Sequence, residues 1–144
     1  MATALILDNN AAHREHIKNA LSDNGHDAFV VSAGSTDEMA QAAEEKLRQI
    51  ASTDAPVDVL VLDMQLDDAQ LGGAIVYEEL VGAGCAQMWR HVLVVSIWCE
   101  GGNQAAALRD FMRENNIPEE NCLPKRSART EQLLKRILEL MGED

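Results

Sequence analysis

Val57-Asp58-Val59-Leu60-Val61-Leu62-Asp63 is the stretch of sequence that decides the fold. Five of the six residues before Asp63 are apolar, so the segment is typical of a β-strand that is buried on both faces and ends in a carboxylate. Three other short, largely apolar segments also end in a polar side chain: Ala4–Asp8, His91–Ser96 and Cys122–Lys125. Strands buried on both faces occur in parallel sheets that are covered by helices. We therefore expect an α/β fold.

Helical patterns alternate with these strands along the chain. Ser35-Thr36-Asp37-Glu38 is a capping-box pattern that opens the longest expected helix. Apolar residues recur on one face of two expected helices, at Met39, Ala43, Leu47 and Ile50 in this one and at Ala107, Leu108, Phe111 and Met112 in a later one. Two other helices are expected to begin near Asn10 and Thr130, and a further one covers about Ile75–Val81 after the entry marked by Gly72-Gly73. The remaining strand covers Asp27–Ala33. Five strand–helix alternations predict a doubly wound, five-stranded parallel sheet of (βα)5 type.

Length and charge limit the possible functions. A chain of 144 residues is long enough to bury a core as a single domain, and we expect one domain over residues 1–144. The formal net charge is −12, which argues against direct binding to nucleic acid because phosphates would be repelled. No apolar stretch approaches the roughly 20 residues that span a bilayer, so we expect no membrane association.

The cysteine pattern bears on the cellular compartment. Cys85, Cys99 and Cys122 are odd in number and lack the spacing of metal ligands. We interpret them as reduced, buried thiols. The N-terminus carries no basic region or cleavage-site pattern that would indicate export. These observations together predict a cytoplasmic protein.

The polar residues at the strand ends form the candidate site. In an open parallel α/β sheet, ligands bind outside the carboxyl ends of the strands. Four strands deliver two carboxylates, a hydroxyl and an ammonium group to that edge: Asp8, Asp63, Ser96 and Lys125. This set predicts a site for a cation and a phosphoryl group.

These residues resemble the receiver domain of bacterial two-component response regulators over essentially the whole chain. The matching elements are Leu-Ile-Leu-Asp8-Asn9, Val-Leu-Val-Leu-Asp63, Val-Val-Ser96 and Lys125, in the order that the family has them. The resemblance implies a flavodoxin-like receiver fold. It also implies that Asp63 accepts a phosphoryl group from a histidine kinase or a phosphotransfer protein, in a phosphorelay.

The resemblance also assigns roles to the other site residues. It implies Mg²⁺ bound by Asp8, Asn9, Asp63 and the backbone carbonyl of Gln65, a ligand set of hard oxygens that suits this cation. Ser96 and Lys125 would contact phosphoryl oxygens and take part in switching. The chain would then be a stand-alone signalling receiver, not an enzyme. It would act through contacts with an unknown downstream protein, as a monomer or a weak homodimer.

Two residues around this site, Asn9 and Ile97, differ from the family pattern. Asn9 stands where a second acid is usual, which removes one negative charge that would face the cation and weakens Mg²⁺ binding. Ile97 follows the hydroxyl where a small residue is usual, and Trp98 comes next. We expect Ile97 and Trp98 to cover the site and to slow phosphoryl turnover.

The last strand departs from the pattern as well, and the departures leave other functions open. Pro124 precedes Lys125 instead of following it, Arg126 comes next, and Cys122 occupies the position of the switch aromatic. One alternative is a pseudo-receiver, a phosphorylation-independent interaction module that keeps the fold without the chemistry. Another is a small phosphatase-like enzyme with Asp63 as its nucleophile. Such enzymes need a second acid two residues later, and Gln65 stands there.

Overall fold

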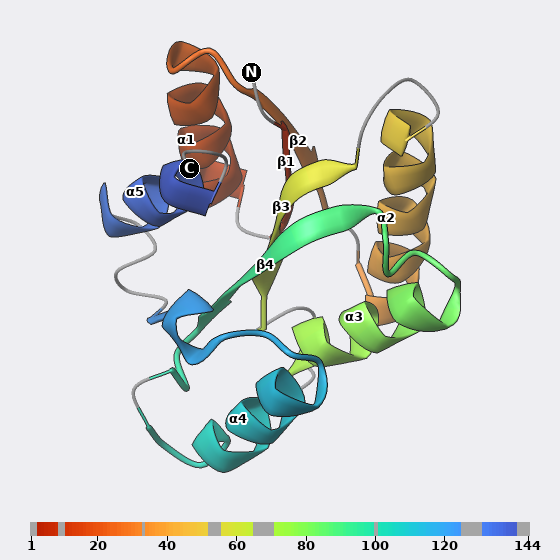
Figure 1. Cartoon of the computed structure of the whole chain (residues 1–144), viewed down its shortest axis with the longest axis vertical. Coiled ribbons are helices and arrows are strands. Elements are labelled where there is room, and N and C mark those ends of the chain that lie inside the picture. The colour runs from red at the N-terminus through yellow and green to blue at the C-terminus, as the bar shows by residue number, and fades with distance from the viewer. Residues whose placement is uncertain are drawn as a thin grey trace.

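A parallel sheet of five strands forms the middle layer of the molecule, in the order β2-β1-β3-β4-β5 (Figure 1). The computed structural model describes residues 3–8, 11–32, 34–51, 56–64, 71–99, 101–124 and 131–140. The strands are β1 (Thr3–Leu7), β2 (Asp27–Val31), β3 (Val57–Asp63), β4 (Trp89–Ser96) and β5 (Cys122–Pro124). All neighbouring strands pair in parallel. The predicted doubly wound fold is therefore confirmed.

Helices cover both faces of this sheet. They are α1 (Ala11–Asp23), α2 (Thr36–Ala51), α3 (Gly72–Gly82), α4 (Ala105–Glu114) and α5 (Glu131–Leu140), and a short 3₁₀ turn, η1 (Glu119–Asn121), precedes β5. α1 and α5 lie on one side of the sheet, and α2, α3 and α4 lie on the other (Figure 1). β3 is the central strand, and its apolar residues are buried against both layers. This double burial explains its nearly continuous apolar run, which only Asp58 interrupts before Asp63.

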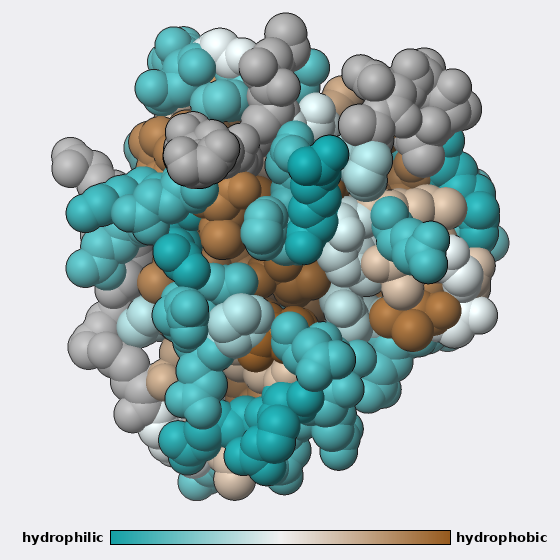
Figure 2. Space-filling model, in the orientation of Figure 1, coloured by the Kyte–Doolittle hydropathy of each residue, from teal (hydrophilic) through white to brown (hydrophobic). Residues whose placement is uncertain are grey.

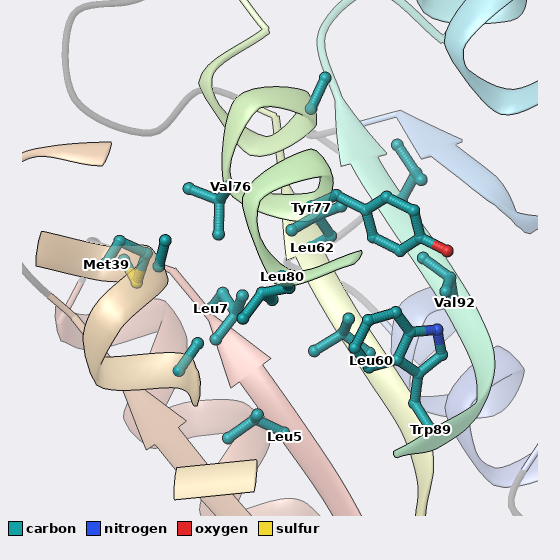
Figure 3. Close-up of a cluster of buried hydrophobic side chains, with 14 of the residues drawn as sticks. Leu5, Leu7, Met39, Leu60, Leu62, Val76, Tyr77, Leu80, Trp89 and Val92 are labelled. Atoms are coloured by element: carbon teal, nitrogen blue, oxygen red, sulfur yellow. The ribbon is translucent and has the colours of Figure 1, made fainter. Parts of the chain in front are cut away.

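The larger core cluster fills the layer between the sheet and the helices α2, α3 and α4. Figure 3 shows Leu5, Leu7, Leu60 and Leu62 on the strands facing Val76 and Leu80 of α3. At the edge of this cluster, Tyr77 packs against two other aromatic rings. Its ring centroid lies 5.3 Å from that of Trp89 and 5.5 Å from that of Phe111. Each fully buried leucine of this kind contributes roughly 1.5–3 kcal/mol to folding.

Ser35 caps the start of α2, as the Ser35-Thr36-Asp37-Glu38 pattern predicted; the Glu38 carboxylate accepts a bond from the Ser35 hydroxyl at 3.4 Å in place of the backbone bond of a full capping box. The Ser35 hydroxyl accepts a hydrogen bond from the Glu38 backbone N–H at 3.2 Å, which satisfies one of the free donors at the start of the helix. Met39, Ala43 and Leu47 are completely buried on the inner face, and Ile50 is half-buried against the same cluster. The predicted apolar face of α2 is therefore confirmed.

A buried polar connection ties α5 to β4. The Asn121 side chain lies in the interior and donates a hydrogen bond to the Val92 carbonyl at 3.1 Å. Its carbonyl oxygen accepts a bond from the Arg136 guanidinium of α5 at 2.6 Å. Asn121 therefore links the last helix to the sheet through both of its polar atoms.

The inner face of α4 corrects one prediction. Leu108, Phe111 and Met112 are buried as expected, but Ala107 is exposed and Ala105 is buried instead. α4 begins at Ala105, two residues later than predicted. The apolar spacing alone did not identify which alanine faces the core, because the helix carries three alanines in a row at its start.

The prediction of three reduced thiols was wrong for two of the cysteines. Cys99 and Cys122 form a disulfide, with their Cα atoms 5.8 Å apart. β4 and β5 are adjacent in the sheet, so the segment after β4 and the first residue of β5 come together although they are 23 positions apart in sequence. Cys85 is a free, buried thiol, as predicted.

The face drawn in Figure 2 is mainly hydrophilic, with hydrophobic residues gathered toward its middle and a smaller hydrophobic patch on the side where α3 lies in Figure 1. Ile75 and Val81 of α3 are exposed large apolar residues. Among the helices of the described ranges, none has the length and apolar character that crossing a bilayer requires.

Candidate functional site

The register of the sheet aligns three of the four predicted strand-end residues. Leu7 of β1 pairs with Leu62 of β3, so Asp8 and Asp63 follow at the same level on neighbouring strands. Asp63 pairs with Val95 of β4, and Ser96 comes one position later. Their exposed fractions are 3% for Asp8, 3% for Asp63 and 0% for Ser96. The structure thus brings two buried carboxylates and a buried hydroxyl to one edge of the sheet.

The backbone at Asp8 is held from two sides. Its N–H donates a hydrogen bond to the Val31 carbonyl of β2 at 3.3 Å. Its carbonyl accepts a bond from the Arg14 guanidinium in α1 at 3.1 Å. Since both bonds use main-chain atoms, they fix the position of Asp8 and leave its carboxylate oxygens to other partners.

α3 packs directly on the backbone of Asp63. The N–H of Met64 bonds to the Val95 carbonyl at 2.9 Å, and the N–H of Gly73 bonds to the Met64 carbonyl at 3.2 Å. A Cβ on Gly73 would lie 2.5 Å from the Asp63 carbonyl oxygen, closer than real Cβ contacts come. Sequence reasoning identified Gly73 only as part of a helix start. Its role in positioning Asp63 follows from this close approach.

The Ser96 hydroxyl closes a local turn. Its oxygen accepts a hydrogen bond from the Trp98 backbone N–H at 2.9 Å. A hydroxyl carries one proton and two lone pairs, so it accepts this bond and remains able to donate. The turn therefore couples the orientation of Ser96 to the path of the chain that leads into α4.

The two residues after Ser96 lie in different environments. Ile97 is 54% exposed, although it is a large apolar side chain. Trp98 is half-buried, and a Cβ on Gly102 would lie 2.6 Å from two atoms of its ring. The ring also lines a cleft with Leu108 and other residues of the α4–β5 side. Covering of the phosphoryl site by Ile97 and Trp98 stays a prediction.

The remaining predicted site residues fall outside the described residues. These are Asn9, Gln65 and Lys125, with Asn9 directly after Asp8, Gln65 two positions beyond Asp63, and Lys125 directly after β5. Their roles stay predictions.

The donor set suits a hard divalent cation. Within the described ranges, no group of three or more histidine, cysteine, aspartate or glutamate side chains is placed to hold a metal. Mg²⁺ does not need such a group, because it keeps several water ligands and commonly binds through one or two carboxylates. Carboxylates at the same level on neighbouring strands repel each other. A cation between Asp8 and Asp63 would offset that repulsion.

Comparison with solved structures identifies the fold. The chain is similar to the receiver domain of the Francisella response regulator 1452, with a TM-score of 0.62, 18% identity and coverage of 98% of this chain and 97% of that one. It is similar to the Vibrio cholerae chemotaxis protein CheY4, with a TM-score of 0.64, 17% identity and coverage of 97% and 98%. A response regulator receiver protein from Burkholderia phymatum gives a TM-score of 0.60 at 16% identity, with coverage of 100% and 98%.

These likenesses span nearly the full length of both partners in each pair. No protein-family model matches the sequence, and no curated protein matches it. The chain therefore has the fold of response regulator receiver domains, as the sequence resemblance implied. At such low identity the likeness defines the architecture, and the chemistry of the site must be argued from its residues.

Proposed function

We propose that this protein is a signalling receiver that takes a phosphoryl group onto Asp63 from a histidine kinase or a phosphotransfer protein. The observation that carries the proposal is the alignment of Asp8, Asp63 and Ser96, all buried, at the carboxyl edge of the sheet. The carboxyl edge of a parallel sheet is where open α/β folds bind their ligands. Two carboxylates and a hydroxyl from three adjacent strands offer oxygen ligands there for a cation and a hydrogen bond for a phosphoryl group.

The reaction uses Asp63 as a nucleophile. A carboxylate oxygen attacks phosphorus in line with the phosphorus–nitrogen bond of a phosphohistidine, that bond breaks, and the imidazole leaves with its electron pair and takes up a proton. The product is an acyl phosphate on Asp63. Mg²⁺ bound at Asp8 and Asp63 would neutralise the charge that collects on the phosphoryl oxygens.

The other residues would stabilise the product and transmit the signal. Ser96 would donate its hydroxyl proton to a phosphoryl oxygen, and Lys125 would pair with another as a point charge. Ser96 is bonded to the chain leading into α4, so its reorientation would alter the loop that joins β4 to α4. A local change in charge would thus reach a surface that a partner protein contacts.

Phosphoryl incorporation tests this proposal. The full chain is incubated with Mg²⁺ and phosphoramidate, which offers the phosphorus–nitrogen bond of a phosphohistidine, and its intact mass is measured. We expect one added phosphoryl group, lost in Asp63→Asn and retained in Asp58→Asn, which alters a half-buried aspartate within the same strand. Equal incorporation in Asp63→Asn would contradict the assignment.

A second candidate function has an observation of its own. The Cys99–Cys122 disulfide ties the segment after β4 to β5, and this segment follows the switch hydroxyl directly. A cross-link there restricts the movement that phosphorylation would need, which favours a phosphorylation-independent interaction module. No incorporation in the wild-type chain, with the fold intact by circular dichroism, would favour this module over the receiver chemistry.

A further inference from the structure

The disulfide between Cys99 and Cys122 joins the connection after β4 to the start of β5. Cys99 lies three residues beyond Ser96, in the connection from β4 to α4, and Cys122 is the first residue of β5. We propose that this pair is a redox modification site, opened and closed by exchange with a small thiol–disulfide couple of the glutathione type. Its redox state would set the conformation of the β4–α4 connection.

Access to solvent distinguishes this pair from the third cysteine. Cys99 and Cys122 are half-buried, and both line a cleft of about 70 Å³ together with Trp98, Leu108, Arg109, Met112 and Glu119. Such a cleft has room for a few water molecules, so the tip of a small thiol can approach the sulfur atoms. The Cys85 side chain is completely buried in the core and is closed to the same reagent.

The disulfide is not needed to compensate for a small core. Small secreted domains use disulfides as staples because they cannot bury enough apolar surface. Here two hydrophobic clusters pack on the two faces of a five-stranded sheet, so the core is well developed without the cross-link. In a domain of this kind, a half-buried cystine three residues beyond Ser96 fits a regulatory role better than a structural one; this step rests on the switching role proposed for Ser96.

Contacts connect the pair to the candidate phosphoryl site. Trp98 directly precedes Cys99, donates its backbone N–H to the Ser96 hydroxyl, and packs its ring against Gly102. While the disulfide is closed, Cys99 is anchored to β5 and this turn is held in place. Reduction removes the anchor and frees Trp98 to change its packing. The turn at Ser96 would then relax as well.

The thiol–disulfide exchange takes place in two steps. A thiolate of the small thiol attacks one cysteine sulfur, the Cys99–Cys122 bond breaks, and a mixed disulfide and one cysteine thiolate form. A second thiolate attacks the mixed disulfide, the oxidised small molecule leaves, and the two cysteine thiolates take up protons. The protein gains two electrons and two protons, and two molecules of thiol are converted to one disulfide. Oxidation by the small disulfide is the reverse.

A redox titration of the full chain tests the proposal. The protein is equilibrated in glutathione mixtures of increasing reduced fraction, trapped with acid, and alkylated after unfolding for mass measurement. Cys85→Ala keeps the pair and removes the third thiol, while Cys99→Ser removes the pair. We expect Cys85→Ala to pass from no added alkyl groups to two within the range of the mixtures.

Tryptophan emission reports the conformational part of the proposal. The chain has two tryptophans, so Trp89→Phe leaves Trp98 as the only one. We expect its emission to shift in step with the alkylated fraction, and Cys99→Ser with Trp89→Phe to show no shift across the same mixtures. If the disulfide resists reduction until the protein is unfolded, the proposed redox site is refuted and the disulfide is a structural cross-link. Reduction without a shift in emission would overturn the coupling to the loop.

The outcome does not depend on the phosphoryl chemistry. Asp63→Asn should give the same redox titration as the wild-type chain, because the exchange uses only the two sulfurs. The redox proposal and the proposed phosphoryl acceptor can therefore fail independently.

Discussion

Substitution of Gly73 by alanine tests how closely α3 approaches the candidate site. Gly73 lies in the first turn of α3, and a Cβ there would come 2.5 Å from the Asp63 carbonyl oxygen and 3.0 Å from the Met64 Cα. Both neighbours are main-chain atoms of the strand end, so no flexible side chain can give way. Either the helix or the end of β3 has to shift.

The magnitude follows from two opposing effects. Alanine in place of glycine within a helix is ordinarily stabilising, by roughly 0.5–1 kcal/mol, because the unfolded chain loses less freedom. Overpacking in a tight interior costs about 1–3 kcal/mol. At Gly73 the steric term should dominate, so we expect a net loss of about 1–2 kcal/mol in the free energy of unfolding.

Gly82 in the same helix provides the matched control. A Cβ at Gly82 meets no atom within 4 Å, so Gly82→Ala has no clash and should be neutral or stabilising. Urea unfolding followed by far-ultraviolet circular dichroism measures both variants. Equal effects of the two substitutions, or a gain in stability for Gly73→Ala, would refute the close contact between α3 and Asp63.

Three further predictions concern the core and the helix ends. Ser35→Ala removes the cap of α2 and should lower the free energy of unfolding by about 0.5–2 kcal/mol, while Ser22→Ala at an exposed position in α1 should change it little. Asn121→Ala removes the bond to the Val92 carbonyl in the interior and the bond to the half-buried Arg136 guanidinium, and should cost about 1–3 kcal/mol in the same urea assay. Asn24→Ala loses only an exposed hydrogen bond and should be nearly neutral, so equal losses would contradict the buried link. Burial raises the pKa of Tyr77 above its ordinary value of 10.0, with a hydrogen bond from Trp89 as a smaller opposing effect. The folded state thus holds the phenol proton more tightly, so stability from this group is complete below the unfolded pKa and is lost as pH rises through the folded pKa. Since Tyr77 is the only tyrosine, absorbance of the phenolate should titrate at higher pH in the folded protein than in guanidinium, and coincident curves would contradict its burial.

The sheet could be predicted well from the sequence because strands that are buried on both faces consist mostly of apolar residues. The run ending at Asp63 is almost entirely apolar because β3 is central and covered on both faces, and β3 has the predicted bounds. The cap at Ser35 could be predicted equally well, because capping depends on residues that are close together in sequence. Once the strand order is known, parallel register alone brings Asp8 level with Asp63.

What the sequence did not predict depends on contacts between distant segments. The Cys99–Cys122 pairing requires the β4–β5 neighbourhood and the path of the loop after Ser96, neither of which local spacing reveals. The close packing of Gly73 on Asp63 is also a tertiary contact, and the Gly72-Gly73 pair was its only signal in the sequence. Both features lie around the candidate site.

Binding of beryllofluoride, a mimic of the acyl phosphate, tests the central claim most directly. The full chain is titrated with Mg²⁺ and then with beryllofluoride by calorimetry, with Asp63→Asn and Asp8→Asn as site variants and Asp58→Asn as the control within β3. We predict saturable, Mg²⁺-dependent binding that Asp63→Asn abolishes, Asp8→Asn weakens and Asp58→Asn leaves intact. Undiminished binding by Asp63→Asn, or no binding by a folded wild-type chain, would contradict a phosphoryl site at Asp63.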